Sequence, residues 1–140
     1  MKSYVLDASV VAAAFFQEDH ADRAQRLLAG GCALYAPDLI YAELANVIWK
    51  RHRRGEIDPD EAGRLLADLR SLPLQITPCG DLVEAALELA LRTGRSVYDC
   101  LYLALAVATR SVLVSADQRL VNALAGTSLA THIAWIGSAR

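Results

Sequence analysis

Short apolar segments alternate with amphipathic segments along the whole chain. The apolar segments have three or four residues, as buried strands do, and the amphipathic ones repeat apolar residues at the spacing of one buried helix face. The pattern predicts strands at residues 3–6, 33–35, 74–76, 111–114 and 133–135. It predicts helices from about residue 9, at 20–29, at 38–52, from 59 to at least 69, at 83–91, at 98–109 and at 117–124.

Strands that alternate with helices in this way indicate a parallel sheet covered by helices on both faces. We therefore expect a three-layer α/β/α fold with a central, mostly parallel sheet. The 140 residues are enough for one complete core, so a single domain over residues 1–140 is expected. In folds of this class ligands bind at the carboxyl ends of the strands.

Composition narrows the class of protein. The hydrophobic content of 54% and the net charge of −2 exclude intrinsic disorder. The longest uninterrupted apolar run, residues 100–108, is less than half of the roughly twenty residues that a membrane span needs, so no membrane association is expected. Three widely spaced cysteines are typical of reduced core residues, which favours a cytoplasmic protein.

Positive charge is concentrated in one place, the basic cluster Lys50, Arg51, Arg53 and Arg54. The cluster lies at the end of a predicted helix, where cations stabilise the negative end of the helix dipole. It could instead contact phosphate groups of a nucleic acid beside an active site. Because positive and negative side chains nearly balance over the whole chain, an extended basic coat for nucleic acid is excluded.

Three aspartates lie where ligands of such folds bind. Asp7 directly follows the first strand, Asp117 lies shortly after the fourth, and Asp99 is in the first turn of a predicted buried helix. Each has a structural alternative, because an acidic side chain at a helix N-terminus accepts hydrogen bonds from free N–H groups. The sequences Ser96-x-x-Asp99 and Ser115-x-x-Gln118 both resemble capping boxes.

Glu43 has a different setting, in the helix predicted at 38–52. Apolar side chains surround most of that helix, and Glu43, Asn46 and Lys50 share one narrow polar stripe. A surface helix normally has a much wider polar face. The stripe therefore favours a cleft or a partner contact, unless packing or a dimer covers the rest of the helix.

Convergence of Asp7, Glu43, Asp99 and Asp117 would be costly, since two unit charges about 4 Å apart repel by about 4 kcal/mol at an effective dielectric near 20. Protonation or a divalent cation must relieve this repulsion. Oxygen ligands without His or Cys favour Mg²⁺ or Mn²⁺, and the three histidines are scattered. Such a metal ion activates water for the hydrolysis of a phosphodiester.

Four stretches of the chain resemble the PIN-domain ribonucleases, in particular the VapC-type toxins of VapBC toxin–antitoxin pairs. In family order they are VLDASVV from Val5, PDL-x-x-x-EL-x-NV from Pro37, YDC-x-YLALA from Tyr98 and LVSAD-x-RL from Leu113. Each is weak alone, but four in register across the chain are specific.

The resemblance implies an activity and a set of residues. It implies that Asp7, Glu43, Asp99 and Asp117 bind Mg²⁺ or Mn²⁺ and cleave RNA endonucleolytically, with Ser9, Asn46 and Ser115 in support. The implied substrate is structured RNA such as tRNA or rRNA, whose cleavage inhibits translation. The implied partners are a VapB-type antitoxin that inserts into the cleft and a second copy in a homodimer.

Two other hypotheses compete with a ribonuclease. A receiver-like signalling domain also gathers acids at strand ends, but it needs a lysine after a late strand, and the only lysines are Lys2 and Lys50. A catalytically inactive PIN-like interaction module normally lacks one of the acids, and all four are present here.

Overall fold

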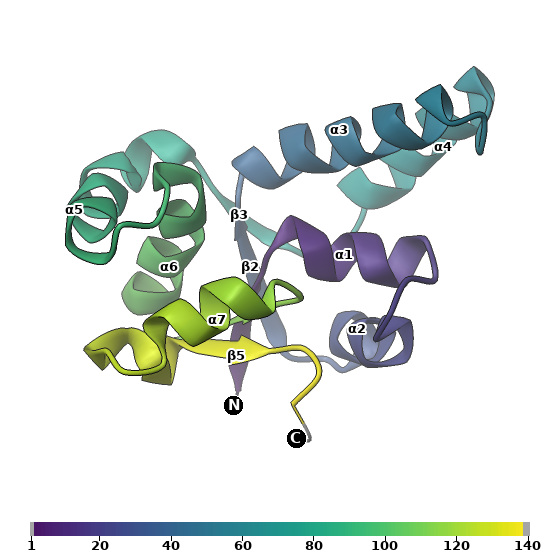
Figure 1. The fold of residues 1–140 in the computed structure, drawn as a ribbon. Helices are drawn as coiled ribbons and strands as arrows, with labels where there is room; N and C mark the ends of the chain where they lie inside the picture. The colour runs from purple at the N-terminus through teal and green to yellow at the C-terminus, as the bar shows by residue number, and fades with distance from the viewer. Residues whose placement is uncertain (1, 139–140) are drawn as a thin grey trace.

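The computed structural model describes residues 2–138 and contains one five-stranded sheet (Figure 1). Its strands are β1 (Ser3–Leu6), β2 (Ala33–Pro37), β3 (Gln75–Thr77), β4 (Val112–Ser115) and β5 (Ile133–Trp135). They lie in the order β3-β2-β1-β4-β5, and every neighbouring pair is parallel. The sheet predicted from the apolar segments is confirmed, and it is parallel throughout.

Seven α-helices connect and cover the strands in the described part of the chain. They are α1 (Ala8–Phe15), α2 (Ala21–Ala29), α3 (Leu39–Arg53), α4 (Pro59–Arg70), α5 (Val83–Thr93), α6 (Val97–Thr109) and α7 (Gln118–Leu124). Wherever the sequence pattern predicted the end of a helix, the observed end lies within about two residues of it. Two 3₁₀ helices, Cys79–Asp81 and Ser128–His132, were not predicted, since three to five residues are too few to show a period.

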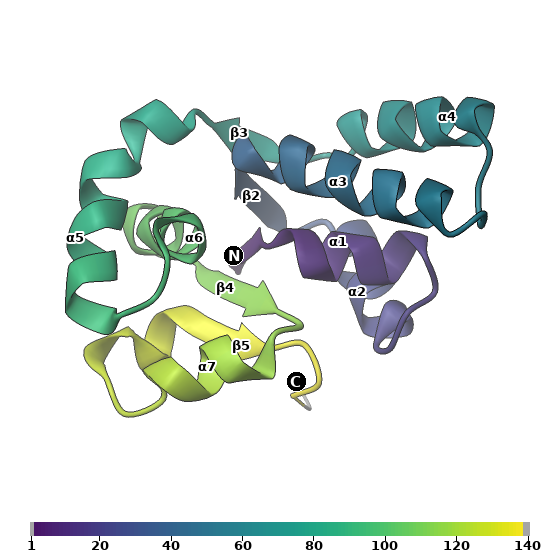
Figure 2. The same cartoon turned by 45° about the horizontal axis from the view of Figure 1, so that its top comes forward.

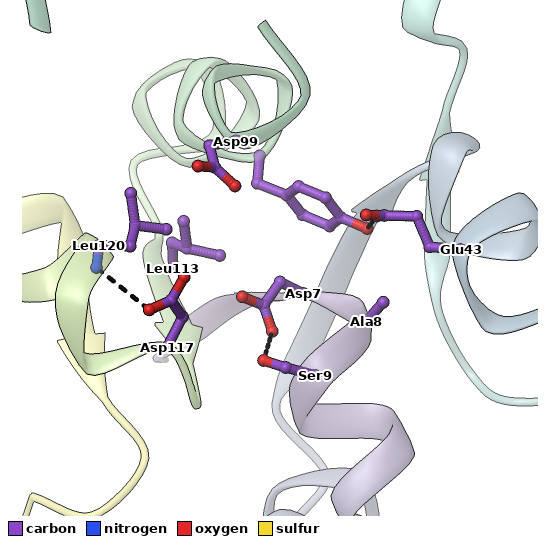
Figure 3. A pocket seen from close by; sticks show the side chains of 9 residues that line it. Asp7, Ala8, Ser9, Glu43, Asp99, Leu113, Asp117 and Leu120 are labelled. Atoms are coloured by element: carbon purple, nitrogen blue, oxygen red, sulfur yellow. Dashed lines mark hydrogen bonds between the residues drawn. The ribbon is translucent and has the colours of Figure 1, made fainter. Parts of the chain in front are cut away.

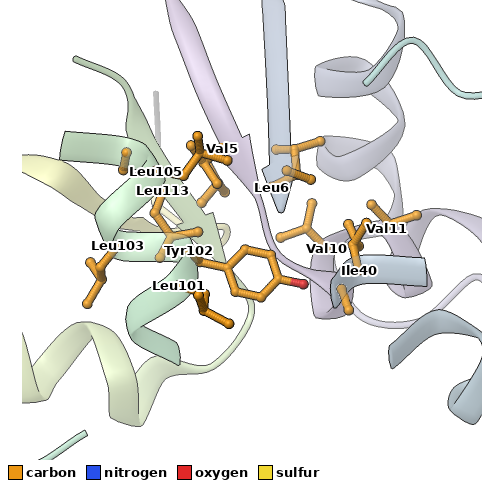
Figure 4. Close-up of a cluster of buried hydrophobic side chains, with 14 of the residues drawn as sticks. Val5, Leu6, Val10, Val11, Ile40, Leu101, Tyr102, Leu103, Leu105 and Leu113 are labelled. Carbon is orange, nitrogen blue, oxygen red and sulfur yellow. The ribbon is translucent and has the colours of Figure 1, made fainter. Parts of the chain in front are cut away.

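The three expected layers are present. Successive side chains of a strand point to opposite faces of the sheet, so one face of β1 carries Val5 and the other carries Leu6. Val5 lies with Leu113 against α6, and Leu6 lies toward Val10 of α1 (Figure 4). All four side chains are completely buried, so the core occupies both faces of the sheet.

Helices α3 and α4 lie side by side and extend away from the sheet (Figure 2). The buried residues of α3 are Ile40, Leu44 and Ile48, which recur every four residues and form one stripe. The apolar circumference predicted for this helix is therefore only partly covered, and the Trp49 side chain is 50% exposed. The reason is that α3 packs on one side only, against α1, α4 and the sheet.

The strand order excludes the receiver-like hypothesis. Receiver domains have the order 2-1-3-4-5, whereas here the third strand lies at the edge beside β2. Because all strands are parallel, the segments after β1, β2 and β4 leave the sheet at the same edge. Among the described residues, no helix combines the length and the apolarity that crossing a membrane requires.

Leu103 provides a test of this packing, because its side chain is fully buried on α6. Leu103→Ala should lower the free energy of unfolding by about 3 kcal/mol through reduced burial and the cavity left behind. The matched control is Leu91→Ala on α5, where the side chain is 79% exposed and a change of about 0.5 kcal/mol or less is expected. Denaturant unfolding measures both, and equal losses of stability would contradict this packing.

Candidate functional site

The four predicted acids line one cavity of about 170 Å³ at the carboxyl edge of the sheet (Figure 3). They come from four places in the chain: the β1–α1 junction, α3, α6 and the β4–α7 junction. The full lining is Asp7, Ala8, Ser9, Glu43, Asp99, Tyr102, Leu113, Asp117 and Leu120. The fold thus brings together side chains that are up to 110 residues apart in the sequence.

Asp7 is the N-cap of α1 and faces the cavity as well. Its Oδ1 accepts a hydrogen bond from the Val10 N–H at 3.2 Å and one from the Ser9 hydroxyl. Burial raises the pKa of Asp7 from 3.8 to about 6, although hydrogen bonds from Ser115, Ser9 and Val10 favour the charged form. The nearby Glu43 carboxylate raises the pKa further. Asp7 is therefore partly protonated near pH 6 when no cation is bound.

Asp117 occupies the corresponding position in front of α7. Its Oδ1 accepts hydrogen bonds from the N–H groups of Arg119 at 3.0 Å and Leu120 at 3.4 Å. Asp117 rather than Ser115 is thus the N-cap, and the Ser115-x-x-Gln118 capping box was wrong. The capping and cavity-lining interpretations are both correct for Asp7 and Asp117, because the helix N–H groups hold each carboxylate at the cavity wall.

Ser9 and Ser115 connect these two acids. The Ser9 hydroxyl accepts a hydrogen bond from the Ala116 N–H at 3.1 Å while it donates to Asp7. The completely buried Ser115 hydroxyl accepts one from the Asp117 N–H at 3.0 Å. The two serines therefore fix the β4–α7 junction against the start of α1, which sets the spacing of Asp7 and Asp117.

Asp99 does not cap its helix. Ser96 is the N-cap of α6, and its hydroxyl accepts the Asp99 N–H at 3.1 Å. The Asp99 carboxylate instead forms an ion pair with Arg95, one turn earlier, at 3.5 Å. Half of the predicted Ser96-x-x-Asp99 capping box is therefore present, since Ser96 caps the helix while the Asp99 carboxylate forms no cap and remains at the cavity.

Glu43 faces the cavity from the second turn of α3, and Tyr102 of α6 donates its hydroxyl proton to Glu43 Oε1 at 2.5 Å. Burial raises the pKa of Glu43, the hydrogen bond from Tyr102 opposes this, and the Asp99 carboxylate adds to it. Burial and the Glu43 charge raise the pKa of Tyr102, so its hydroxyl stays protonated as a donor. No role was predicted for Tyr102 from the sequence. The available signal was a single hydroxyl in the apolar run 100–108, since a buried Tyr hydroxyl normally needs a partner.

The remaining predicted residues lie outside the cavity lining. Asn46 is exposed on α3, and Lys50, Arg53 and Arg54 line a separate surface hollow of about 300 Å³. At 1.5 Å per residue this hollow begins roughly 10 Å along the helix from Glu43. Arg51 forms ion pairs with Glu18 at 2.5 Å and Glu56 at 3.1 Å, so it ties α3 to neighbouring loops.

Comparison with known proteins identifies the family of this chain. The PIN domain family profile matches residues 4–125. The chain belongs to the PIN domain family. It is 35% identical over 118 residues to ribonuclease VapC3 of Pyrobaculum aerophilum, covering 83% of this chain and 90% of that protein. It is 33% identical over 116 residues to VapC ribonuclease Mb0985 of Mycobacterium bovis, covering 83% and 87%.

Solved structures share the fold of this PIN domain. The crystal structure of PAE2754 from Pyrobaculum aerophilum has a TM-score of 0.65 at 26% identity and covers 96% of this chain and 84% of that one. VapBC2 from Rickettsia felis, crystallised with a DNA fragment from its promoter, has a TM-score of 0.62 at 17% identity and covers 95% and 98%. The second likeness concerns the fold alone.

The cavity of this PIN domain has the donor chemistry of a hard divalent cation, since carboxylate and hydroxyl oxygens line it without His or Cys. Within residues 2–138, no three acidic, His or Cys side chains are close enough to hold an ion together. Mg²⁺ usually keeps several waters and needs only one or two carboxylates directly. A cavity of about 170 Å³ has room for several waters. The residues therefore fit a hydrated Mg²⁺ or Mn²⁺ ion.

The raised pKa of Asp7 predicts how stability depends on pH. Protonated Asp7 stabilises the folded state fully below about pH 4, and this contribution is lost as pH rises through about 6. Asp7→Asn keeps the acceptor for the α1 cap without the charge. In EDTA at pH 7.5 it should therefore be more stable than wild type by about 2 kcal/mol, and the gain should shrink by pH 4.5.

Urea unfolding of both proteins at the two pH values measures this difference. The control is Asp19→Asn, which removes one carboxylate from an exposed position outside the cavity. A wild type that is the more stable protein at pH 7.5, or a difference that does not change with pH, would contradict the burial of an ionised Asp7.

Proposed function

We propose that this protein is a Mg²⁺- or Mn²⁺-dependent endoribonuclease and the toxin of a type II toxin–antitoxin pair. The observation that carries the proposal is the convergence of Asp7, Glu43, Asp99 and Asp117 on one cavity. The relatives from Pyrobaculum aerophilum and Mycobacterium bovis are both named as VapC ribonucleases, and each aligns with 83% of this chain. An inactive interaction module normally lacks one of these acids, whereas all four line the cavity here.

One or two of the four acids would bind the cation directly and the others would bind its waters, and the cation would supply Lewis-acid chemistry for hydrolysis of a phosphodiester. The helix N–H groups and the two serines hold Asp7 and Asp117 in place, so these carboxylates do not need to reorganise. Arg95 holds the Asp99 carboxylate through an ion pair, and Tyr102 holds the Glu43 carboxylate through a hydrogen bond. The chain's contribution is thus a fixed wall of carboxylates, with Leu113 and Leu120 as apolar parts of the same lining.

The proposed substrate is structured cellular RNA of the tRNA or rRNA class, so that cleavage inhibits translation. Lys50 and Arg53 lie on the same helix as Glu43, Arg54 caps that helix, and the three side chains would contact phosphates on one side of the cut. The proposed partners are a VapB-type antitoxin, which would cover the acidic cavity, and a second copy of the chain. The relatives carry the name VapC, the Rickettsia felis structure carries the name VapBC2, and a structure of the same fold from Klebsiella pneumoniae is named a toxin–antitoxin complex.

Removal of one cavity acid tests the nuclease. Asp99→Asn should lower the initial rate of RNA cleavage at least about 100-fold in Mg²⁺, because loss of a ligand exceeds the 10- to 100-fold cost of outer-sphere changes. EDTA should abolish wild-type cleavage, and Mn²⁺ should restore it. Asp81→Asn, an exposed position outside the cavity lining, is the control and should cleave as wild type does. Equal rates for wild type and Asp99→Asn would refute the proposal.

The basic cluster is tested through the salt dependence of RNA binding. Arg53→Ala with Arg54→Ala should reduce the slope of log K against log salt by about 0.7 for each RNA phosphate that the variant no longer binds. Arg51→Ala should lower stability instead, because Arg51 is engaged by Glu18 and Glu56. Fluorescence anisotropy with an RNA hairpin in Ca²⁺ measures the slope. An unchanged slope would assign the cluster to a solvated helix end.

A further inference from the structure

Tyr102 crosses the cavity between two helices that carry different acids. It belongs to α6, three residues after Asp99, so the two side chains lie on the same side of that helix. Its ring extends from α6 toward Ile40 of α3 (Figure 4), and its hydroxyl donates to Glu43 Oε1 at 2.5 Å. Helix α6 therefore presents one acid to the cavity and holds a second one from the opposite wall.

The hydrogen bond from Tyr102 to Glu43 is the single polar contact between α3 and α6. Within residues 2–138, no other hydrogen bond or ion pair joins these two helices. Helix α3 packs mainly on α4 and α1, while α6 packs on α5 and the sheet. Without the Tyr102 hydroxyl, the Glu43 side chain would stay on its helix but would no longer be directed to the cavity by a hydrogen bond.

The buried core around α6 holds the Tyr102 ring in place. The side chain is only 4% exposed, and its neighbours Leu101, Leu103 and Leu105 are buried in the same helix. A buried aromatic ring has few accessible rotamers, so its hydroxyl oxygen is fixed relative to the sheet. Glu43 has three side-chain torsions and no other described hydrogen-bond partner, so its position depends on Tyr102.

We propose that Tyr102 is a positioning residue that holds the Glu43 carboxylate against the cavity, so that Glu43 and Asp99 act on the same divalent cation. The inference rests on the proposed metal-dependent function and extends it to a residue that would not touch the cation. A ring that only fills the core would do the same packing without its hydroxyl. The two roles are therefore separated by removing one oxygen atom.

The test is Tyr102→Phe, with Tyr35→Phe on β2 as the matched control. The Tyr35 hydroxyl has no hydrogen-bond partner in the described structure, so its removal deletes the same atom without breaking a bond. Calorimetry of Mg²⁺ binding at pH 7.5, without RNA, should show about tenfold weaker binding for Tyr102→Phe, as expected when an outer-sphere hydrogen bond is removed, and no change for Tyr35→Phe. In cleavage assays the Mg²⁺ requirement of Tyr102→Phe should rise about tenfold, while KM for RNA stays within about twofold.

A Glu43→Gln background separates positioning from a general effect on the fold. If Tyr102 acts through the Glu43 carboxylate, adding Tyr102→Phe to Glu43→Gln should weaken Mg²⁺ binding by less than about twofold more. An equal tenfold loss in both backgrounds would overturn the proposal, and so would a Tyr102→Phe protein that binds Mg²⁺ as wild type does. Loss of the native circular dichroism spectrum in Tyr102→Phe would likewise assign the hydroxyl to stability alone.

The outcomes distinguish this inference from the function on which it rests. If wild type and Tyr35→Phe neither bind Mg²⁺ nor cleave RNA, the proposed function is wrong. If both bind and cleave, Glu43→Gln is impaired and Tyr102→Phe is not, then the function stands and the positioning role of Tyr102 is wrong.

Discussion

The burial of neighbouring carboxylates at one edge of the sheet is the constraint on which the rest of the site depends. A charged carboxylate loses hydration free energy on burial, and burial is the largest cause of the raised pKa of Asp7 and of Glu43. A neighbouring carboxylate raises each pKa further. The chain limits this cost at each acid. The N-termini of α1 and α7 donate to Asp7 and Asp117, Arg95 pairs with Asp99, and Tyr102 donates to Glu43. Burial still raises the pKa of Asp7 to about 6, so the relief is incomplete without a cation.

The same contacts that stabilise the fold also fix the site. Asp7 and Asp117 are helix caps, which a protein of any function would use, yet capping is what holds both carboxylates at the cavity wall. The parallel sheet contributes by directing the segments after β1 and β4 to one edge. Structural and functional roles therefore coincide at these residues, and substitutions there need separate measurements of stability and of cation binding.

Much of this arrangement could be predicted from the sequence, because it depends on local patterns. The apolar segments located all five strands, and the position of Asp7 and Asp117 after strands placed them at the binding edge. Other features depend on side-chain directions and distant partners that no local pattern contains. Two contacts are of this kind: the ion pair of Arg51 with Glu18, 33 residues away, and the hydrogen bond that Tyr102 donates to Glu43 on α3. The exposure of Trp49 was missed because periodicity shows which side of a helix is apolar and not how much of it is covered.

The most direct test of the central claim is anomalous diffraction from crystals of the wild-type protein soaked in Mn²⁺. We predict an anomalous peak inside the cavity, within direct or water-mediated reach of Asp7, Glu43, Asp99 and Asp117. Crystals in which Mn²⁺ is found elsewhere and this cavity holds none, with the four carboxylates accessible to solvent, would contradict that claim.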